Sequence, residues 1–199
     1  MKELKLSTGT NIEHIFHTHS GAVAYGFSSI NLDLMQKAAD VIVGAIIDGK
    51  NIFTCGNGAS ASIAQHWACD YTKGCSFLER GIKPRVISLS GNIPLMTAIS
   101  NDISYDEVYS YQLERLADPG DVLITISSSG NSPNVVRAIE VAKTMDVTTI
   151  ALTGFHGGKC KEMSDIPVHV DLHEYEAAED VHQAIMHMIA KYIRMKTNA

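Results

Sequence analysis

The chain has 199 residues, of which 45% are hydrophobic and 19% charged, and its formal net charge is −6. This length suits one α/β domain with an additional helical segment. The acidic balance and the lack of a basic stripe argue against direct binding of nucleic acid. No signal-peptide core opens the chain, and no run of about 18 apolar residues occurs in it. We therefore expect a cytoplasmic protein that does not bind or cross a membrane, with its four cysteines reduced.

The first 50 residues are expected to be helical from residue 10 onward. Leu32, Ile42 and Ile46 recur there at helical spacing, and Gly49 is expected to end the segment as a C-cap. Beyond it, short apolar runs alternate with helical stretches. The predicted strands are 51–56, 85–90, 121–127, 148–154 and 166–172. The predicted helices are 59–74, 94–102, 106–117, 132–145 and 176–196.

Apolar strands that alternate with helices indicate a parallel sheet covered on both faces. We therefore predict an α/β fold, a three-layer sandwich with a five-stranded parallel sheet. Residues 1–50 form an N-terminal helical segment that packs in an oligomer, and residues 51–199 form the binding domain. Ligands of such sheets bind beyond the carboxyl ends of the strands.

Two loops at those ends are rich in small polar residues. The sequence GNGASAS spans residues 56–62, and SSSGNS spans residues 127–132. Each loop precedes a predicted helix, whose free N–H groups and partial positive charge suit a phosphate. Glycine turns with serine caps would account for either loop alone, whereas two such loops on one sheet favour an anion site. Neither loop contains lysine or arginine, which favours a phosphate monoester over a triphosphate.

Histidines and carboxylates on two predicted helices are candidates for proton transfer. His66 and Asp70 lie four residues apart and share a helix face. Glu179, His182 and His187 lie on the last helix. Solvated surface pairs would show the same spacing, so the pattern alone leaves their role open.

The chain resembles the SIS domains of phosphoheptose isomerases over about residues 10–195. The two serine loops, AISNDISYDEVY (98–109) and LTGFHGGK (152–159) carry the resemblance. It implies a flavodoxin-like sheet, a homotetramer and sites shared between subunits. It also implies conversion of D-sedoheptulose 7-phosphate to D-glycero-D-manno-heptose 7-phosphate, which supplies heptose for lipopolysaccharide or capsule.

The resemblance also implies roles for particular residues. Asp70 and His187 would be the catalytic proton carriers. A zinc ion would be bound by His66, Asp70, Glu179 and His187. The substrate would be bound by Asn57, Gly58, Ser60, Asn101, Asp102, Ser127, Ser128, Ser129, Ser132 and Glu179.

Two residues at the centre of this site depart from the family pattern. Asp70 stands where the family has glutamate, and Glu179 stands where it has glutamine. The shorter side chain reaches less far, and the added charge would either strengthen a zinc site or raise the pKa of Asp70. Two other functions stay open: a non-catalytic adaptor that binds a replication initiator protein, and a SIS protein that acts on another sugar phosphate.

Overall fold

A computed structural model describes residues 11–76 and 81–197 of the chain. Its centre is a sheet of five parallel strands in the order β2-β1-β3-β4-β5. All five predicted strands are present and the parallel pairing is confirmed, as is the doubly wound order of a flavodoxin-like sheet. The strands are β1 (Asn51–Gly56), β2 (Arg85–Ser88), β3 (Val122–Ser127), β4 (Thr148–Thr153) and β5 (Ile166–His169).

The predicted helices are also present, with one addition. Helix α7 was not predicted, because Gly157 and Gly158 are typical of a turn; here Gly157 takes a φ of 86° and begins the helix. A short 3₁₀ turn, η2 (Tyr105–Glu107), precedes α5. The α-helices are α1 (Ile12–Ser29), α2 (Leu32–Ile47), α3 (Ala59–Gly74), α4 (Ile93–Asp102), α5 (Ser110–Leu116), α6 (Pro133–Thr144), α7 (Gly158–Met163) and α8 (Tyr175–Thr197).

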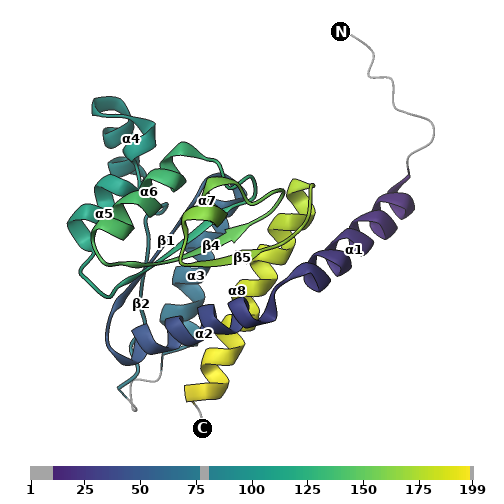
Figure 1. Ribbon diagram of the computed structural model, residues 1–199, viewed down its shortest axis with the longest axis horizontal. Coiled ribbons are helices and arrows are strands. Elements are labelled where there is room, and N and C mark those ends of the chain that lie inside the picture. The colour runs from purple at the N-terminus through teal and green to yellow at the C-terminus, as the bar shows by residue number, and fades with distance from the viewer. Residues whose placement is uncertain (1–10, 77–80, 198–199) are drawn as a thin grey trace.

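Helices cover both faces of the sheet (Figure 1). Successive side chains of a strand point to opposite faces, so neighbouring residues join different cores. Ile52 and Ile124 face α2, α3 and α8, whereas Phe53 and Leu123 face the side of α5 and α6. The predicted three-layer sandwich is therefore confirmed.

The helical N-terminal segment divides into two helices at Ile30. That residue is extended, and the Asn31 side chain accepts a hydrogen bond of 3.1 Å from the Leu34 N–H, which begins α2. The C-cap of α2 is Asp48, and Gly49 follows it with a φ of 68°. Gly49 was predicted to be the C-cap itself, and it ends the helix from the next position, where left-handed glycine is common.

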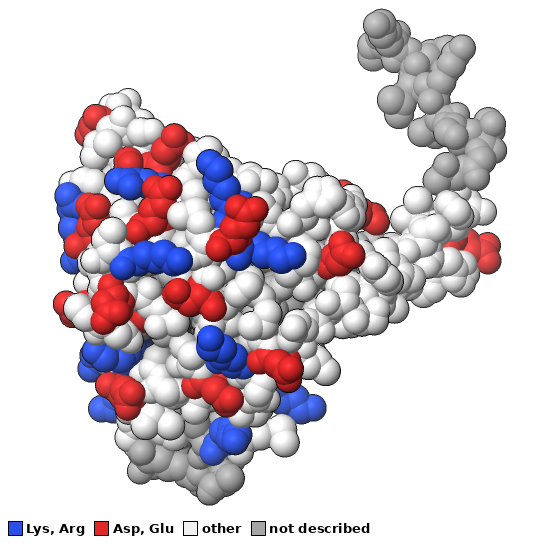
Figure 2. Space-filling model, viewed as in Figure 1, with Lys and Arg blue, Asp and Glu red and all other residues white. Residues whose placement is uncertain are grey.

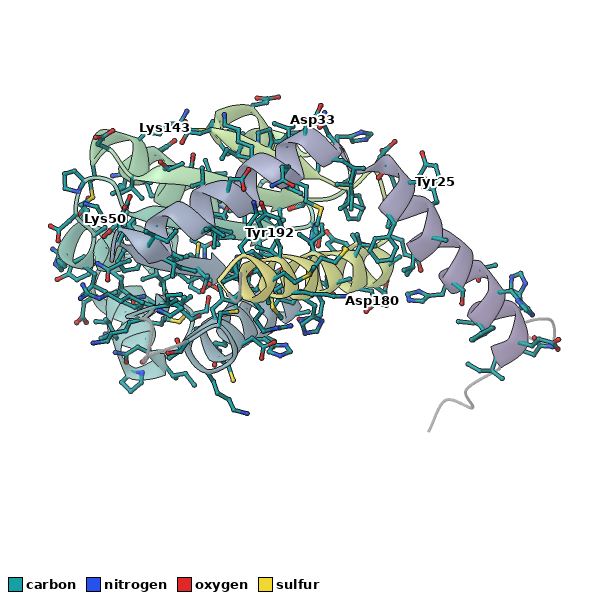
Figure 3. All side chains as sticks on the ribbon, turned by 90° about the horizontal axis from the view of Figure 1, so that it is seen from below. Tyr25, Asp33, Lys50, Lys143, Asp180 and Tyr192 are labelled. Carbon is teal, nitrogen blue, oxygen red and sulfur yellow. The ribbon has the colours of Figure 1, made fainter. Side chains whose placement is uncertain are left out.

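Helix α1 projects away from the body of the protein (Figures 1 and 3). Its His19 pairs with Asp180 of α8 at 2.7 Å, and Gly26 packs against Leu172. Much of its apolar surface stays exposed in the single chain, including Ile12 (82%) and Phe16 (63%). Such a surface is typical of a protein–protein contact.

The charged surface is mixed. On the face in Figure 2, lysine and arginine side chains alternate with aspartate and glutamate, without a patch of one sign. None of the helices within the described residues is long and apolar enough to span a bilayer.

Helices α3 and α8 pack side by side with a defined register. The Tyr71 hydroxyl donates to the Met186 carbonyl at 3.4 Å, and one turn further the Cys75 thiol lies 3.5 Å from the Ala190 carbonyl. Both partners advance by four residues, so the two helices run in the same direction. The same register determines which polar side chains of α3 and α8 meet closer to the N-termini of the two helices.

His182 is a fully buried histidine on α8. Burial lowers its pKa to about 4, although a backbone hydrogen bond with Thr153 acts in the opposite direction. An unfolded chain protonates histidine near pH 6.5. Between pH 6.5 and 4 the unfolded state therefore binds a proton that the native state does not, so this residue lowers stability as the pH falls.

We expect His182→Leu to flatten this part of the pH dependence. The 2.5-unit difference in pKa corresponds to about 3 kcal/mol in the free energy of unfolding. The variant should gain that amount relative to the wild type between pH 7 and 4. Urea unfolding of both proteins at matched concentrations measures the difference, and parallel pH curves would contradict the prediction.

Candidate active site

The two serine loops lie next to each other because β1 and β3 are neighbours in the sheet. Residues 56–58 lead from β1 into α3, and residues 127–132 lead from β3 into α6. The N-termini of both helices therefore point into the same space, where their free N–H groups favour an anion. The predicted convergence of the two loops at one edge is observed.

A pocket of about 170 Å³ occupies this space. Ser60 is buried in its wall, and Ser132 is the N-cap of α6 without using its side chain as a cap. The Ser128 hydroxyl is buried and has no hydrogen-bond partner. A buried hydroxyl without a partner costs free energy, which a ligand oxygen in the pocket would recover. The lining residues are Asn57, Ser60, Ile126, Ser127, Ser128, Ser129, Ser132, Tyr175 and Glu179.

Glycines allow each serine loop to pack closely against a neighbouring segment of the chain. Gly130 has a φ of 66°, and a Cβ atom there would collide with the backbone of Gly157. A Cβ atom on Gly56 would lie 2.7 Å from the Ile126 carbonyl oxygen. The shape of the serine pocket therefore depends on backbone contacts that no larger residue permits.

Asn57 is oriented in the pocket by a polar network. Its amide forms a reciprocal pair with the amide of Asn134, at 2.9 and 3.0 Å. Its oxygen also accepts from the hydroxyls of Tyr105 at 3.0 Å and Tyr109 at 2.9 Å. Burial raises the pKa of Tyr109, so this hydroxyl stays a neutral donor. The two tyrosines were not singled out in the sequence, although Tyr105 and Tyr109 lie in the stretch 98–109.

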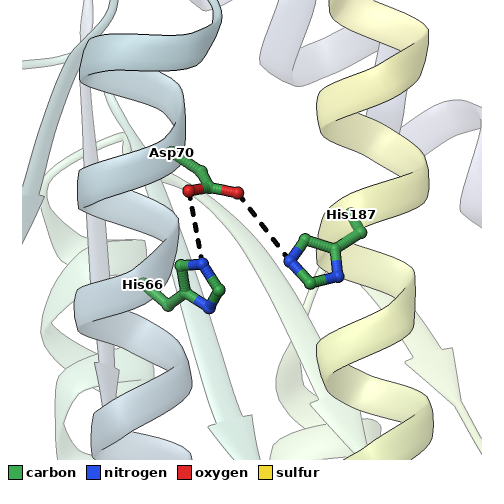
Figure 4. A group of neighbouring side chains, drawn as sticks. All are labelled: His66, Asp70 and His187. Carbon is green, nitrogen blue, oxygen red and sulfur yellow. Dashed lines mark ion pairs between the residues drawn. The ribbon is translucent and has the colours of Figure 1, made fainter.

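His66, Asp70 and His187 come together further along α3 and α8 (Figure 4). His66 Nε2 lies 3.2 Å from Asp70 Oδ1, and His187 Nε2 lies 3.8 Å from Asp70 Oδ2. One donor atom from each side chain lies within 4.8 Å of the others. Two imidazoles and a carboxylate are ligands that zinc accepts, and the apices of a zinc tetrahedron are about 3.4 Å apart. The three residues therefore fit a zinc ion.

Gln183 also joins this group and was not predicted from the sequence. Its Nε2 lies 3.0 Å from His66 Nδ1 and 3.2 Å from His187 Nε2. In the parallel register of α3 and α8, Gln183 lies opposite His66 and His187 lies opposite Asp70. A sequence signal existed, since Gln183 and His187 share a helix face at a spacing of four.

Glu179 is not a member of this group. It lies eight residues before His187, about 12 Å along the helix axis, and lines the serine pocket instead. The pKa of its carboxyl is raised, mainly by burial and then by the negative charges of Glu176 and Asp180. A second cavity of about 350 Å³ shares Glu179 with the serine pocket and also reaches Gln183. Glu179 therefore lies between the serine pocket and the histidine–aspartate group.

Three other predicted residues do not line the serine pocket. Asn101 and Asp102 are exposed at the end of α4, where the Asn101 amide donates to the Asp102 carboxylate at 2.8 Å. Gly58 is the N-cap of α3 with a φ of 57°, a backbone role that glycine serves well. Within the described residues, substrate contacts for Asn101 and Asp102 stay a prediction.

Comparisons with known proteins agree with this geometry. The SIS domain family model matches residues 19–154. The probable phosphoheptose isomerase of Thermoplasma acidophilum is 41% identical over 169 residues, which is 84% of this chain and 91% of the relative. The phosphoheptose isomerase of Aliarcobacter butzleri is 40% identical over 159 residues, 80% of this chain and 83% of the relative.

Solved structures show the same similarity. The phosphoheptose isomerase of Neisseria gonorrhoeae superposes with a TM-score of 0.84 at 30% identity, covering 92% of this chain and 96% of that one. The enzyme of Francisella tularensis gives a TM-score of 0.82 at 26% identity, covering 96% and 100%.

Proposed function

The chain belongs to the SIS domain family as one of its phosphoheptose isomerases, and we propose how its residues carry out that reaction. The substrate is D-sedoheptulose 7-phosphate and the product D-glycero-D-manno-heptose 7-phosphate. One observation carries the proposal: α3 and α8 contribute Ser60 and Glu179 to the serine pocket, and further along the same two helices they hold the histidine–aspartate group.

The serine pocket would hold the phosphate. Ser60, Ser127, Ser128, Ser129 and Ser132 supply hydroxyl donors, and the helix N-termini supply N–H groups and partial positive charge. Neutral donors are enough for a monoester that carries about two charges. The phosphate then acts as a remote handle, whose binding energy orients the reacting end of the sugar.

The sugar would extend from this pocket past Glu179 toward Asp70. The cavity that links Glu179 and Gln183 provides the space. A carboxylate there accepts hydrogen bonds from sugar hydroxyls. We propose that Glu179 binds the sugar chain in this way, between the phosphate and the reacting carbons.

Asp70 and His187 would move the protons. Aldose–ketose isomerisation passes through an enediol, so one group must carry the carbon-bound proton and a second must serve the two oxygens. The carboxylate and the imidazole face each other across 3.8 Å, which leaves both within reach of one substrate. His66 Nε2, 3.2 Å from Asp70, orients the carboxylate.

A zinc ion is proposed as the cofactor, bound by His66, Asp70 and His187. When bound, it would polarise the sugar oxygens and stabilise negative charge on them. Sedoheptulose isomerisation can be measured with chelated and zinc-loaded protein, so the contribution of the ion can be separated from that of the side chains.

We also propose a homotetramer with sites shared between subunits. The exposed apolar side chains of α1 support an interface on that helix. The enzyme would work in the cytoplasm, without nucleic-acid or membrane partners, and supply heptose for lipopolysaccharide or capsule. Light scattering after gel filtration gives the number of subunits, and a monomer would contradict this part of the proposal.

The reaction itself is tested with purified protein and three sugar phosphates. Sedoheptulose 7-phosphate should be converted to the heptose 7-phosphate, followed by NMR of the product. Fructose 6-phosphate and ribulose 5-phosphate serve as shorter controls and should react far more slowly. Faster turnover of either control would assign the chain to another sugar phosphate, and no turnover with zinc-loaded protein would reject the isomerase.

A further inference from the structure

Asn57 lines the serine pocket, and protein contacts hold its side-chain amide in one orientation. The Val135 N–H lies 3.0 Å from Asn134 Oδ1, and because a backbone N–H can only donate, this atom of Asn134 is its oxygen. The Asn134 amide nitrogen is then the group that donates to Asn57 at 3.0 Å, so the accepting atom is the Asn57 oxygen. A backbone donor therefore fixes both amides of the pair.

The oxygen of Asn57 has no capacity left to accept a hydrogen bond from a ligand. A carbonyl oxygen has two lone pairs. Three groups donate to this one, namely the Asn134 amide at 3.0 Å and the hydroxyls of Tyr105 at 3.0 Å and Tyr109 at 2.9 Å. The Asn57 nitrogen has two protons, and among the described residues its one acceptor is Asn134 Oδ1, at 2.9 Å. The second proton is left for an acceptor in the pocket.

The two tyrosines differ in what else their hydroxyls contact. Tyr109 is fully buried, and its single hydroxyl proton also has the Gly56 carbonyl as an acceptor, 2.5 Å away. Tyr105 is 53% exposed, and within residues 11–76 and 81–197 its hydroxyl has one acceptor, Asn57. Removal of the Tyr105 hydroxyl therefore breaks one hydrogen bond and leaves the packing of the core intact.

The 3₁₀ turn η2, which carries Tyr105, is fixed to α6. Ser104 begins the turn, and its hydroxyl accepts from the Asp106 N–H at 3.1 Å. Glu107, the last residue of the turn, pairs with Arg137 of α6 at 3.0 Å. Since the N-terminus of α6 forms one side of the serine pocket, Tyr105 is held in place relative to that pocket.

We propose that Tyr105 is a positioning residue for phosphate binding: its hydroxyl occupies the Asn57 oxygen, so that the second amide proton of Asn57 is directed at the anion in the serine pocket. Ionised phosphate oxygens accept hydrogen bonds, and an N–H donor to them is stronger than a neutral pair. Without the hydroxyl, the Asn57 oxygen would be free to turn toward water and the amide would lose its direction. The inference rests on the proposed function, because it takes the phosphate of the substrate as the ligand.

The test measures the binding of inorganic phosphate to the full-length chain by titration calorimetry. Tyr105→Phe, Asn57→Ala and the double variant form a double-mutant cycle with wild type. Tyr192→Phe is the matched control, since the Tyr192 hydroxyl donates to Asp40 of α2 at 2.8 Å and does not line the serine pocket. Urea unfolding should give equal stability for Tyr105→Phe and wild type. Asn57→Ser takes the place of Asn57→Ala in the cycle if the alanine variant does not fold.

Tyr105→Phe should raise the dissociation constant of phosphate about 3- to 10-fold, the effect of one neutral hydrogen bond. Asn57→Ala should raise it further. Adding Tyr105→Phe to that variant should change nothing more, because the amide through which Tyr105 acts is gone. Tyr192→Phe should bind phosphate as wild type does. With sedoheptulose 7-phosphate, Tyr105→Phe should raise KM by the same factor and leave kcat unchanged, because the phosphate is remote from Asp70.

Wild-type affinity for phosphate in Tyr105→Phe would overturn the inference. Additive effects in the double variant would overturn it as well, since Tyr105 would then act independently of Asn57, and so would a wild type that does not bind phosphate. Binding is measured without the sugar, so it decides the role of Tyr105 even if the chain does not isomerise sedoheptulose 7-phosphate. The expected changes in phosphate binding together with no turnover would reject the isomerase alone.

Discussion

Asp70→Asn is expected to abolish most of the isomerase activity while the protein stays folded. Asparagine has nearly the same shape and can still contact His66, but its amide cannot take up a proton. Losing one positioned acid–base group lowers kcat about 10²- to 10⁴-fold. Since Asp70 does not line the serine pocket, KM should change little.

Asp146→Asn is the control for this substitution. Asp146 is exposed just before β4, at the edge of the sheet opposite the serine loops, and its φ of 58° is one that asparagine tolerates. It should keep full activity. Steady-state kinetics and circular dichroism measure both variants, and more than a tenth of wild-type kcat in Asp70→Asn would exclude Asp70 as a proton carrier.

Ser128→Ala should weaken the binding of sugar phosphate without lowering stability. The hydroxyl is buried without a partner, so its removal leaves the free energy of unfolding unchanged or raises it by up to about 1 kcal/mol. A hydrogen bond to a charged group contributes about 1.5–3 kcal/mol. KM and the inhibition constant of inorganic phosphate should therefore rise about 10- to 100-fold.

Ser164→Ala is the control, because it removes another buried hydroxyl that has no hydrogen-bond partner. Ser164 follows α7, and its Oγ is also buried without a partner, but it does not line the serine pocket. Phosphate binding should be unaffected in this variant. Equal weakening by both substitutions would show that Ser128 acts through the fold and not through the ligand.

Most of this fold can be predicted from the sequence because the residues that begin and end its strands and helices lie close together in the chain. Four of the five strands, β1 to β4, end in a glycine or serine loop that is visible within a few residues, and Pro133 with Ser132 indicates where α6 begins. The five strands were therefore accessible from the sequence pattern, whereas the flavodoxin-like arrangement of the sheet was implied only by the family resemblance. Helix α7 was not accessible, because its first residues are glycines and it is held by long-range contacts: Cys160 packs in the core, and the Cys160 N–H donates to the Gly130 carbonyl at 2.9 Å.

The site was predictable only in part, since it depends on the contact between two helices. The His66–Asp70 pair lies within one helix and was found from its spacing. Which residue of α8 meets this pair depends on the register of α3 against α8, set by long-range contacts such as that of Tyr71 with Met186. The resemblance assigned Glu179, whereas the structure brings Gln183 to the histidines.

The spacing of the two groups along α3 has a consequence for which sugars can react. Ser60 in its first turn and Asp70 are ten residues apart, so a rigid rod of roughly 15 Å separates the two ends of the substrate. One carbon–carbon bond spans about 1.5 Å, more than the ~1 Å misplacement that costs ~100-fold in rate. The helix therefore selects substrates by length. A sugar that is one carbon too short cannot place its phosphate in the serine pocket and its reacting carbons at Asp70 at the same time.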